Sequence, residues 1–349
     1  MNTPRVGLRC DAGPQRGVGH LVRCLALGEE FLSRGARVQM FGTVAGVGWA
    51  ADQLAARGIP RHPGPETPEE LVETVRRHEV DVLVLDSYEL DPAAAGAVRA
   101  AGVVTLAIVD GDTRGQDADL YLDQNFDTDL VVPAGRLLAG SAYALLRGEV
   151  LAARPTAARP AVPVDRPTVL AFFGGTDAAG AAPLLTEMLL STGRPMALTV
   201  VAGRPDLADR LTRLAPAPGQ TLTVLPPTGR LPALIAAADL VVSAAGTSTW
   251  ELCCLGAPSA LVCVVDNQRE SYHRVVSAGL AAGLGDLPTL GVDPSARAAA
   301  ARTLDSLLGS AQRRAALSQR AWSAVDGRGR ARVVDAVLDT LDSSVERLC

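Results

Sequence analysis

A chain of 349 residues is longer than one ordinary hydrophobic core, so its length favours two domains of comparable size. Hydrophobic residues make up 48% of the chain and charged residues 20%, as in globular proteins, while 3% aromatic residues argue against a platform that stacks nucleic-acid bases. The net charge of −5 gives no general attraction to nucleic acids or anionic membranes, so neither is expected as a partner.

The sequence enters a strand-like run without a charged-then-apolar signal segment, and no apolar stretch reaches the length of a membrane span. We therefore expect a cytoplasmic protein. Six cysteines lack metal-ligand spacing, and most of them fall within expected strands and helices, which predicts buried thiols without disulfides or a metal. They are Cys10, Cys24, Cys253, Cys254, Cys263 and Cys349.

In the first half of the chain, buried strand-like runs alternate with amphipathic segments. Strands are expected at residues 5–10, 38–42, 80–86, 103–109, 120–122 and 137–138, and helices at 20–34, 48–57, 68–78 and 91–101. This alternation predicts a parallel doubly wound sheet, whose ligands collect at the carboxyl ends of the strands. Those ends carry Asp11, His20, Tyr88 and Asp110.

Residues 151–166 lose periodicity and are rich in proline, which indicates a linker. A second alternation follows, with strands at 167–173, 196–201, 221–225, 238–242 and 259–265, and the tail 294–348 is helical with a break at 326–329. The sequence thus predicts an α/β protein with two facing Rossmann-like domains, 1–155 and 167–325, and a cleft between them. Residues 326–349 form a C-terminal helix that is expected to pack back on the N-terminal domain.

His20 follows a glycine-containing loop, Gly17 to Gly19, at the junction of loop and helix. A lone histidine is more often structural, but at this address a neutral imidazole could accept a proton from water or a sugar hydroxyl, with Asp11 orienting it. Arg9 and Arg23 are either anion ligands or solvated surface charges. The loop is too short for a dinucleotide fingerprint, and no P-loop lysine pattern occurs, which disfavours nicotinamide chemistry and ATP hydrolysis.

Two glycine turns in the second half could hold phosphate through backbone N–H groups. They comprise Gly246, Thr247 and Ser248 in one turn and Gly174, Gly175 and Thr176 in the other. For the latter, a tight turn capped by Asp177 is the alternative, and it is compatible with phosphate binding. Glu251, one turn further on, could accept hydrogen bonds from a sugar diol. Asn267 and Gln268 follow the next strand and should face the cleft unless they form a solvated turn, and Tyr88 is either cleft wall or core.

Six motifs in this order resemble the UDP-2,4-diacetamido-2,4,6-trideoxy-β-L-altropyranose hydrolases of pseudaminic acid biosynthesis and their spore-coat polysaccharide biosynthesis relatives. The first is Arg9-x-Asp11-Ala12-x5-Val18-Gly19-His20-x2-Arg23-Cys24-Leu25-x-Leu27. The others are Asp86-Ser87-Tyr88, Leu138-Ala139-Gly140-x2-Tyr143-Ala144-Leu145-Leu146-Arg147, Phe173-Gly174-Gly175-Thr176-Asp177, residues 243–268, and Asp326-Gly327-x-Gly329. The resemblance covers nearly the whole chain.

The resemblance implies the glycosyltransferase-B fold, similar to that of the lipid II N-acetylglucosaminyltransferase, with UDP held mainly by the C-terminal domain. It implies direct attack of water on the anomeric carbon with UDP as leaving group, and neither a metal nor a cofactor. His20 matches the family's proposed base, and Tyr88 and Asn267 match the residues near the sugar. Gly175 and the turn 246–249 would contact the pyrophosphate, and Glu251 the ribose.

The sequence departs from the family on the sugar side, at Gly13, Arg16 and Gly111, and it lacks the Trp-Glu pair often found downstream of the tyrosine. These departures leave the sugar and the acceptor open, and UDP, dTDP and CMP remain alternatives for the nucleotide. A glycosyltransferase in which His20 deprotonates an acceptor hydroxyl is the main alternative activity. A non-catalytic nucleotide-sugar-binding protein is another, and a Rossmann oxidoreductase or epimerase lacks its glycine fingerprint.

Overall fold

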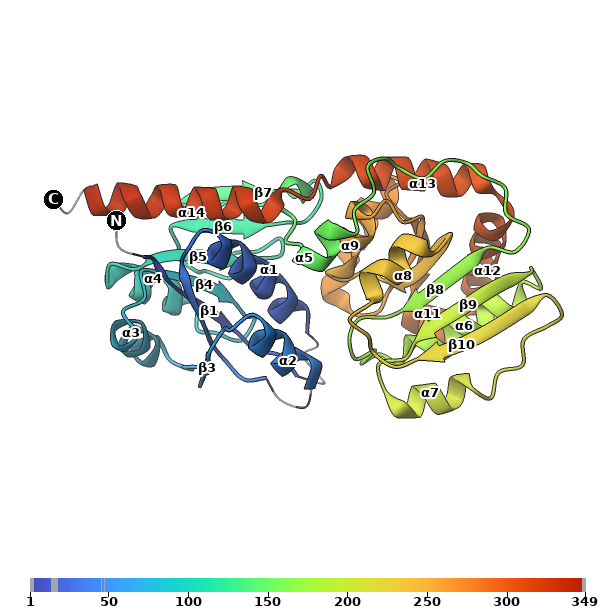
Figure 1. Ribbon diagram of the computed structural model, residues 1–349, viewed down its shortest axis with the longest axis horizontal. Coiled ribbons are helices and arrows are strands. Elements are labelled where there is room, and N and C mark those ends of the chain that lie inside the picture. Colours follow the sequence, from blue (N-terminus) through green and yellow to red (C-terminus); the bar gives the residue numbers. More distant parts are fainter. Residues whose placement is uncertain (1–2, 14–17, 45, 47, 347–349) are drawn as a thin grey trace. The chain divides into compact units, whose positions relative to one another are not determined.

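The computed structural model describes residues 3–13, 18–44, 46 and 48–346 (Figure 1). The chain divides into two compact units: unit 1 is Met1–Gly148 with Gly327–Cys349, and unit 2 is Glu149–Asp326. The boundary falls just before residues 151–166, where the linker was expected. Each unit is an α/β unit with one parallel sheet, so the expected fold class, two Rossmann-like domains, is confirmed.

Unit 1 contains a seven-stranded parallel sheet in the order β3-β2-β1-β4-β5-β6-β7. Its strands are β1 Arg5–Cys10, β2 Arg37–Phe41, β3 Arg61–His62, β4 Val82–Asp86, β5 Val104–Ile108, β6 Leu120–Asp123 and β7 Arg136–Ala139. Its helices are α1 Gly19–Ser33, α2 Gly48–Ala56, α3 Pro68–Arg77, α4 Ala93–Ala100, the 3-10 helix η1 Ser141–Tyr143 and α14 Gly329–Glu346, and α5 Gly148–Ala152 begins at its border.

Side chains alternate between the two faces of this sheet, and each face buries its own core. One face packs on α1, α2 and α14, and the other on α3 and α4. Val333, Val334 and Val337 of α14 are fully buried in the first core together with Leu27 and Phe31 of α1. Helix α14 is therefore an integral part of unit 1, although almost two hundred residues separate it from β7 in the chain.

Unit 2 contains a six-stranded parallel sheet in the order β10-β9-β8-β11-β12-β13. Its strands are β8 Thr168–Phe172, β9 Met196–Val201, β10 Gln220–Leu225, β11 Leu240–Ala244, β12 Ser259–Cys263 and β13 Ala282–Asp286. Its helices are α6 Ala181–Ser191, α7 Pro205–Leu211, α8 Leu231–Ala237, α9 Ser248–Cys254, the 3-10 helix η2 Asp266–Gln268, α10 Arg269–Ser277, α11 Leu287–Val292, α12 Pro294–Gly309 and α13 Ala311–Ala324.

The proline-rich segment after α5 is tied to unit 2 by arginine side chains. Arg159 donates to the carbonyl oxygens of Ile235 (2.9 Å) and Ala236 (2.6 Å), which lie at the C-terminal end of α8. The N–H of Ala238 also reaches the Ile235 carbonyl over 3.3 Å, and the guanidinium adds a closer partner for both carbonyls. The segment lacks periodicity, yet side-chain hydrogen bonds hold it in place.

In each sheet the strand order reverses once, between β1 and β4 in unit 1 and between β8 and β11 in unit 2. Parallel α/β sheets bind ligands at the carboxyl ends of the strands beside such a reversal, because the flanking helices leave the sheet toward opposite faces there. In unit 1, Asp11 and Tyr88 follow these two strands; in unit 2, Gly174 and Gly246 do. The expected half-sites therefore occupy the equivalent position in both units.

Two further expectations concern burial and membranes. Cys10, Cys24, Cys253, Cys254 and Cys263 are buried and free, as predicted, and Cys349 lies outside the described residues. No helix within the described ranges combines the length and the hydrophobicity needed to cross a membrane.

Candidate functional site

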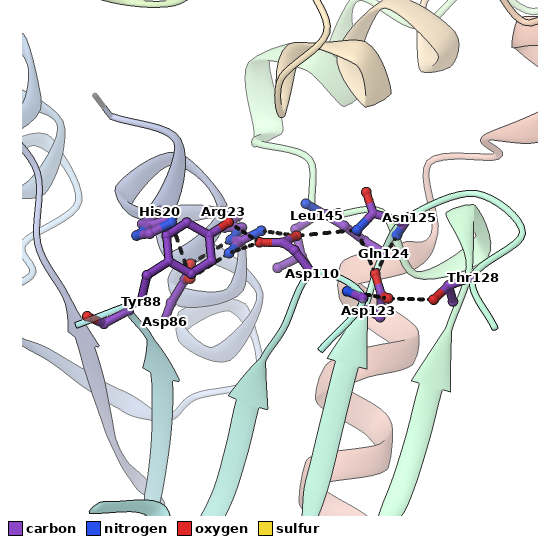
Figure 2. Close-up of polar contacts among 12 residues, drawn as sticks. His20, Arg23, Asp86, Tyr88, Asp110, Asp123, Gln124, Asn125, Thr128 and Leu145 are labelled. Carbon is purple, nitrogen blue, oxygen red and sulfur yellow. Dashed lines mark hydrogen bonds and ion pairs between the residues drawn. The ribbon is translucent and has the colours of Figure 1, made fainter. Parts of the chain in front are cut away.

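A buried ion-pair cluster joins α1 to the ends of β4 and β5 (Figure 2). Arg23 binds both carboxylate oxygens of Asp86, through Nε and Nη2, at 2.6 Å each. Its Nη1 and Nη2 also bind the two oxygens of Asp110 at 3.0 Å each. The side chains of Arg23 and Asp86 are 3% and 1% exposed and that of Asp110 is 21% exposed, so we define the buried cluster as these three residues.

The solvated-charge interpretation is wrong for Arg9 and for Arg23, because both side chains are buried. Arg23 is buried and its guanidinium is engaged by two carboxylates, so it is neither a solvated charge nor open to an anion. Arg9 is 4% exposed and donates to Asp11 (2.7 Å) and to the carbonyl oxygen of Pro65 (3.1 Å). The sequence could not reveal the partners of Arg23, because Asp86 and Asp110 come from β4 and from the loop after β5.

The buried cluster favours the charged forms of Arg23 and Asp110. Burial alone would raise the pKa of Asp110, but the Arg23 guanidinium outweighs it and holds that pKa well below its ordinary value. Burial likewise opposes the charged form of Arg23, yet Asp110 and Asp86 raise its pKa well above the ordinary value. One guanidinium against two carboxylates leaves the cluster with one negative charge.

His20 and Tyr88, both predicted site residues, lie together above the buried cluster (Figure 2). Their rings meet edge to face with centroids 4.7 Å apart. His20 Nε2 is 4.0 Å from Asp86 Oδ1, too far for a hydrogen bond but close enough for the carboxylate to attract a positive charge on the imidazole. The Tyr88 hydroxyl donates to Asp110, and the Arg114 guanidinium covers the Tyr88 ring, with its Cζ 4.6 Å from the ring centroid.

The phenol of Tyr88 is held in its neutral form. Although the residue is 42% exposed, which excludes the core interpretation, its hydroxyl points inward to Asp110. Burial of the hydroxyl and then the negative charge of Asp110 raise the pKa of Tyr88. Because Asp110 is ionised and can only accept, the phenol proton lies on the side of Asp110.

Asp11 is held by its neighbours in the chain and in the sheet, and its role beside His20 stays a prediction. Its carboxylate accepts from Arg9 Nη1 and from the backbone N–H of Thr43, both at 2.7 Å. The carboxylate beside His20 is Asp86. Gly19 is the first residue of α1, while Gly17 and Arg16 lie outside the described residues.

Sequence reasoning missed a second acidic centre at the end of β6. Asp123 is fully buried and accepts hydrogen bonds from the N–H of Gly111 (3.0 Å) and the hydroxyl of Thr128 (2.6 Å). Asn125 Nδ2 donates to Asp123 (2.8 Å) and, over 3.4 Å, to Asp110. The sequence did contain a signal for this centre, because Asp123 and Asn125 lie at the carboxyl end of a buried strand, as Tyr88 and Asp110 do.

In unit 2, the turn after β8 is capped from within. Asp177, 2% exposed, accepts from the N–H groups of Ala181 (2.8 Å) and Ala182 (2.9 Å) at the start of α6. The expected cap is thus present and these two N–H groups are already bonded, while phosphate binding by the rest of the turn stays a prediction. Gly174 and Gly175 are exposed and Thr176 is half-buried, and Gly174 has a φ of 76° that favours glycine.

The turn after β11 brings Gly246 and Gln268 together. Gln268 Oε1 accepts from the N–H of Val264 (3.1 Å), which leaves its Nε2 facing the turn, 3.3 Å from where a Cβ on Gly246 would lie. In the described part of the chain, no backbone hydrogen bond engages the N–H groups of Thr247 and Ser248. Several hydrogen-bond donors therefore converge on this turn.

The remaining predicted residues of unit 2 differ in exposure. Glu251 is only 4% exposed on α9, whereas Asn267 is exposed on η2, which fits both interpretations of Asn267. Thr249 Oγ1 and Ser243 Oγ are buried, and neither has a hydrogen-bond partner among the described residues. Unpaired buried hydroxyls are uncommon in folded proteins.

No protein-family model matches the sequence, and no curated protein is similar to it at a significant level. Solved structures are similar along nearly the whole chain. Acinetobacter baumannii MurG has 16% sequence identity and a TM-score of 0.69, over 96% of this chain and 99% of that one. The Streptomyces sp. SF2575 glycosyltransferase SsfS6, complexed with thymidine diphosphate, has 16% identity and a TM-score of 0.59, over 95% and 99% of the two chains.

Neisseria meningitidis UDP-GlcNAc 2-epimerase, bound to UDP-GlcNAc, has 10% identity and a TM-score of 0.59, over 96% of this chain and 100% of that one. At such identities the likeness shows the fold alone. The expected glycosyltransferase-B fold is confirmed.

Proposed function

We propose that this chain is a nucleotide-sugar hydrolase, which cleaves the anomeric C–O bond of a UDP-linked deoxyamino sugar and releases UDP and the free sugar. The observation that carries the proposal is the arrangement in unit 1, where His20 and Tyr88 stand over the buried cluster beside the strand-order reversal. A partly exposed imidazole there has room for a substrate. The six matching motifs and the shared fold support the same reading.

The nucleotide is assigned to unit 2. The turn Gly246 to Ser248 offers backbone N–H groups, and Gln268 offers its side-chain amide as a further donor. Such convergent donors suit the oxygens of a diphosphate. Gly174, Gly175 and Thr176 would add contacts to the same diphosphate, and Glu251 would accept hydrogen bonds from the ribose.

The reaction needs one water and one base. Water attacks the anomeric carbon, the bond from that carbon to the UDP oxygen breaks, and its electron pair leaves with UDP. The neutral imidazole of His20 takes a proton from the water, and Asp86 at 4.0 Å attracts the charge that the ring gains. Tyr88, whose phenol keeps its proton, and Asn267 would position the sugar and the water.

A glycosyltransferase is the second candidate, because the similar structures include proteins named as glycosyltransferases. In that case His20 deprotonates an acceptor hydroxyl and the other steps are unchanged. Epimerisation stays in consideration as well: the missing glycine fingerprint argues against a dinucleotide-dependent epimerase, whereas a 2-epimerase shares the present fold. The same assay separates all three.

The test is nucleotide and sugar release from a panel of UDP-, dTDP- and CMP-sugars without an acceptor. Stoichiometric free sugar and UDP support the hydrolase. Tight binding without release indicates a transferase, and conversion of one nucleotide sugar into another indicates an epimerase. His20→Ala should lower turnover by about 10²- to 10⁴-fold and leave UDP affinity nearly unchanged.

His273→Ala is the matched control, because His273 is exposed on α10 in unit 2. It should leave turnover at the wild-type rate. Full activity of His20→Ala would show that the base is another residue.

A further inference from the structure

Asp110 receives hydrogen bonds from groups on three different elements (Figure 2). Arg23 of α1 occupies both of its oxygens, the Tyr88 hydroxyl donates to Oδ2, and Asn125 Nδ2 approaches Oδ1. Tyr88 follows β4 and Asn125 follows β6, so Asp110 links the polar groups on either side of β5. One ionised carboxylate thus sets the direction of two neutral side chains.

The amide of Asn125 can adopt only one orientation here. Nδ2 lies 2.8 Å from Asp123 Oδ1 and 3.4 Å from Asp110 Oδ1, and a flipped amide would turn its carbonyl oxygen against two carboxylates. Oδ1 therefore points away from the strand ends, as Figure 2 shows. Within the residues that the structure describes, no hydrogen bond reaches this oxygen, and the side chain is half-buried.

The orientation of the Tyr88 hydroxyl is also set by Asp110. Its single proton is directed to Asp110, so the lone pairs of the phenol oxygen remain for other partners. The side chain is 42% exposed and contacts the ring of His20. Both groups consequently offer hydrogen-bond acceptors, whereas the turn at Gly246 in unit 2 offers donors.

On the basis of the proposed function, we infer that Tyr88 and Asn125 form an acceptor-only contact for the sugar, with Asp110 as the residue that positions both. The sugar group bound there must be a hydrogen-bond donor, namely a hydroxyl or an amide N–H. An ether, a deoxy position or a fluorine substituent does not satisfy the contact. The turn after β6 does not require this arrangement, because the Asn125 backbone N–H already bonds to Asp123 (3.0 Å).

The test measures binding and not turnover, because substituents on the sugar would also change the rate of bond cleavage. The protein carries His20→Phe, which removes the base and keeps an aromatic ring against Tyr88. The ligands are UDP, the panel member with the fastest release, and its deoxy and deoxyfluoro analogues at each hydroxyl or acetamido position. A deoxyfluoro group can accept but cannot donate. Dissociation constants come from calorimetry.

At one sugar position, the deoxy and the deoxyfluoro analogues should both bind about 2- to 10-fold more weakly than the parent, as expected for one lost hydrogen bond. Asn125→Ala should weaken binding of the unmodified nucleotide sugar by a similar factor. In this variant the analogues altered at that one position should bind as well as the unmodified sugar, while the effects at other positions remain. Asp110→Asn should reduce discrimination against the deoxyfluoro analogue, because Tyr88 is then free to donate. Affinity for UDP should not change.

Asp127→Asn is the control, since it removes an exposed acid from the same loop and asparagine tolerates its φ of 53°. It should bind every ligand as the parent protein does. Deoxyfluoro analogues that bind as well as the natural sugar would overturn the assigned polarity. Equal losses with Asn125→Ala at all positions would overturn the role of Asn125. If no panel member binds or is turned over, the proposed function fails and this inference fails with it.

Discussion

Replacing Arg23 by methionine would leave Asp86 and Asp110 at the ends of β4 and β5 without their counter-charge. Arg23 and Asp86 are 3% and 1% exposed, so water cannot compensate for the loss. Breaking a buried pair by removing one partner costs about 3–5 kcal/mol, because an uncompensated charge remains. For a unit of this size, that corresponds to a decrease of about 6–20 °C in the unfolding temperature.

Arg99→Met is the matched control within unit 1. Arg99 also binds two aspartates, Asp117 at 2.7 Å and Asp119 at 3.0 Å, but its side chain is 42% exposed. Exposed pairs contribute about 0–1 kcal/mol. Urea and thermal unfolding of both variants, followed by circular dichroism, should therefore separate them clearly. Equal losses for Arg23→Met and Arg99→Met would refute the claim that burial makes the Arg23 cluster essential to unit 1.

Three further predictions concern pH, a helix cap and the glycine turn. The difference in unfolding free energy between wild type and Arg23→Met should shrink in urea titrations as the pH falls toward and below 3.8. The folded-state pKa of Asp110 is held below that ordinary value, so its ion pair contributes stability that protonation in acid removes. A difference that stays constant with pH would contradict this. Asp177→Ala should lower the free energy of unfolding by about 0.5–2 kcal/mol in denaturant titrations, and Asp177→Asn, which keeps an acceptor oxygen, by less; equal losses would contradict the cap. Gly246→Ala should weaken UDP binding about 2- to 10-fold in calorimetry, because the added Cβ displaces Gln268. Gly229→Ala is the control and should not change the affinity, since a Cβ there has no atom within 4 Å. Equal affinities of the two variants would argue against UDP binding at the turn.

Strands and helices with clear periodicity could be predicted from the sequence. The strand Arg5–Cys10 is as expected, and α1 begins one residue before its expected start. Two of the elements that were missed carry weak local signals: β3 has only two residues, and β13, with the sequence AGLGD, has two glycines and little β propensity. Both form at sheet edges, where pairing with a neighbouring strand compensates for low propensity.

The candidate site was predictable to the extent that it depends on strand ends. His20 and Tyr88 were identified because parallel strands place such residues at one edge of a sheet. The partners of Arg23 and the orientation of Asn125 were not, because they depend on how α1 packs across β1 and on loops that follow β5 and β6. The local sequence does not determine distances between residues that lie far apart in the chain.

The central claim is that water attacks the anomeric carbon, and hydrolysis in ¹⁸O-labelled water tests it most directly. Mass spectrometry of the nucleotide product is the measurement, since free sugars can exchange their anomeric oxygen with water. The account predicts UDP without ¹⁸O, formed without an acceptor and lost in His20→Ala. Label in the nucleotide product would show that a P–O bond had broken, and it would contradict the proposed mechanism.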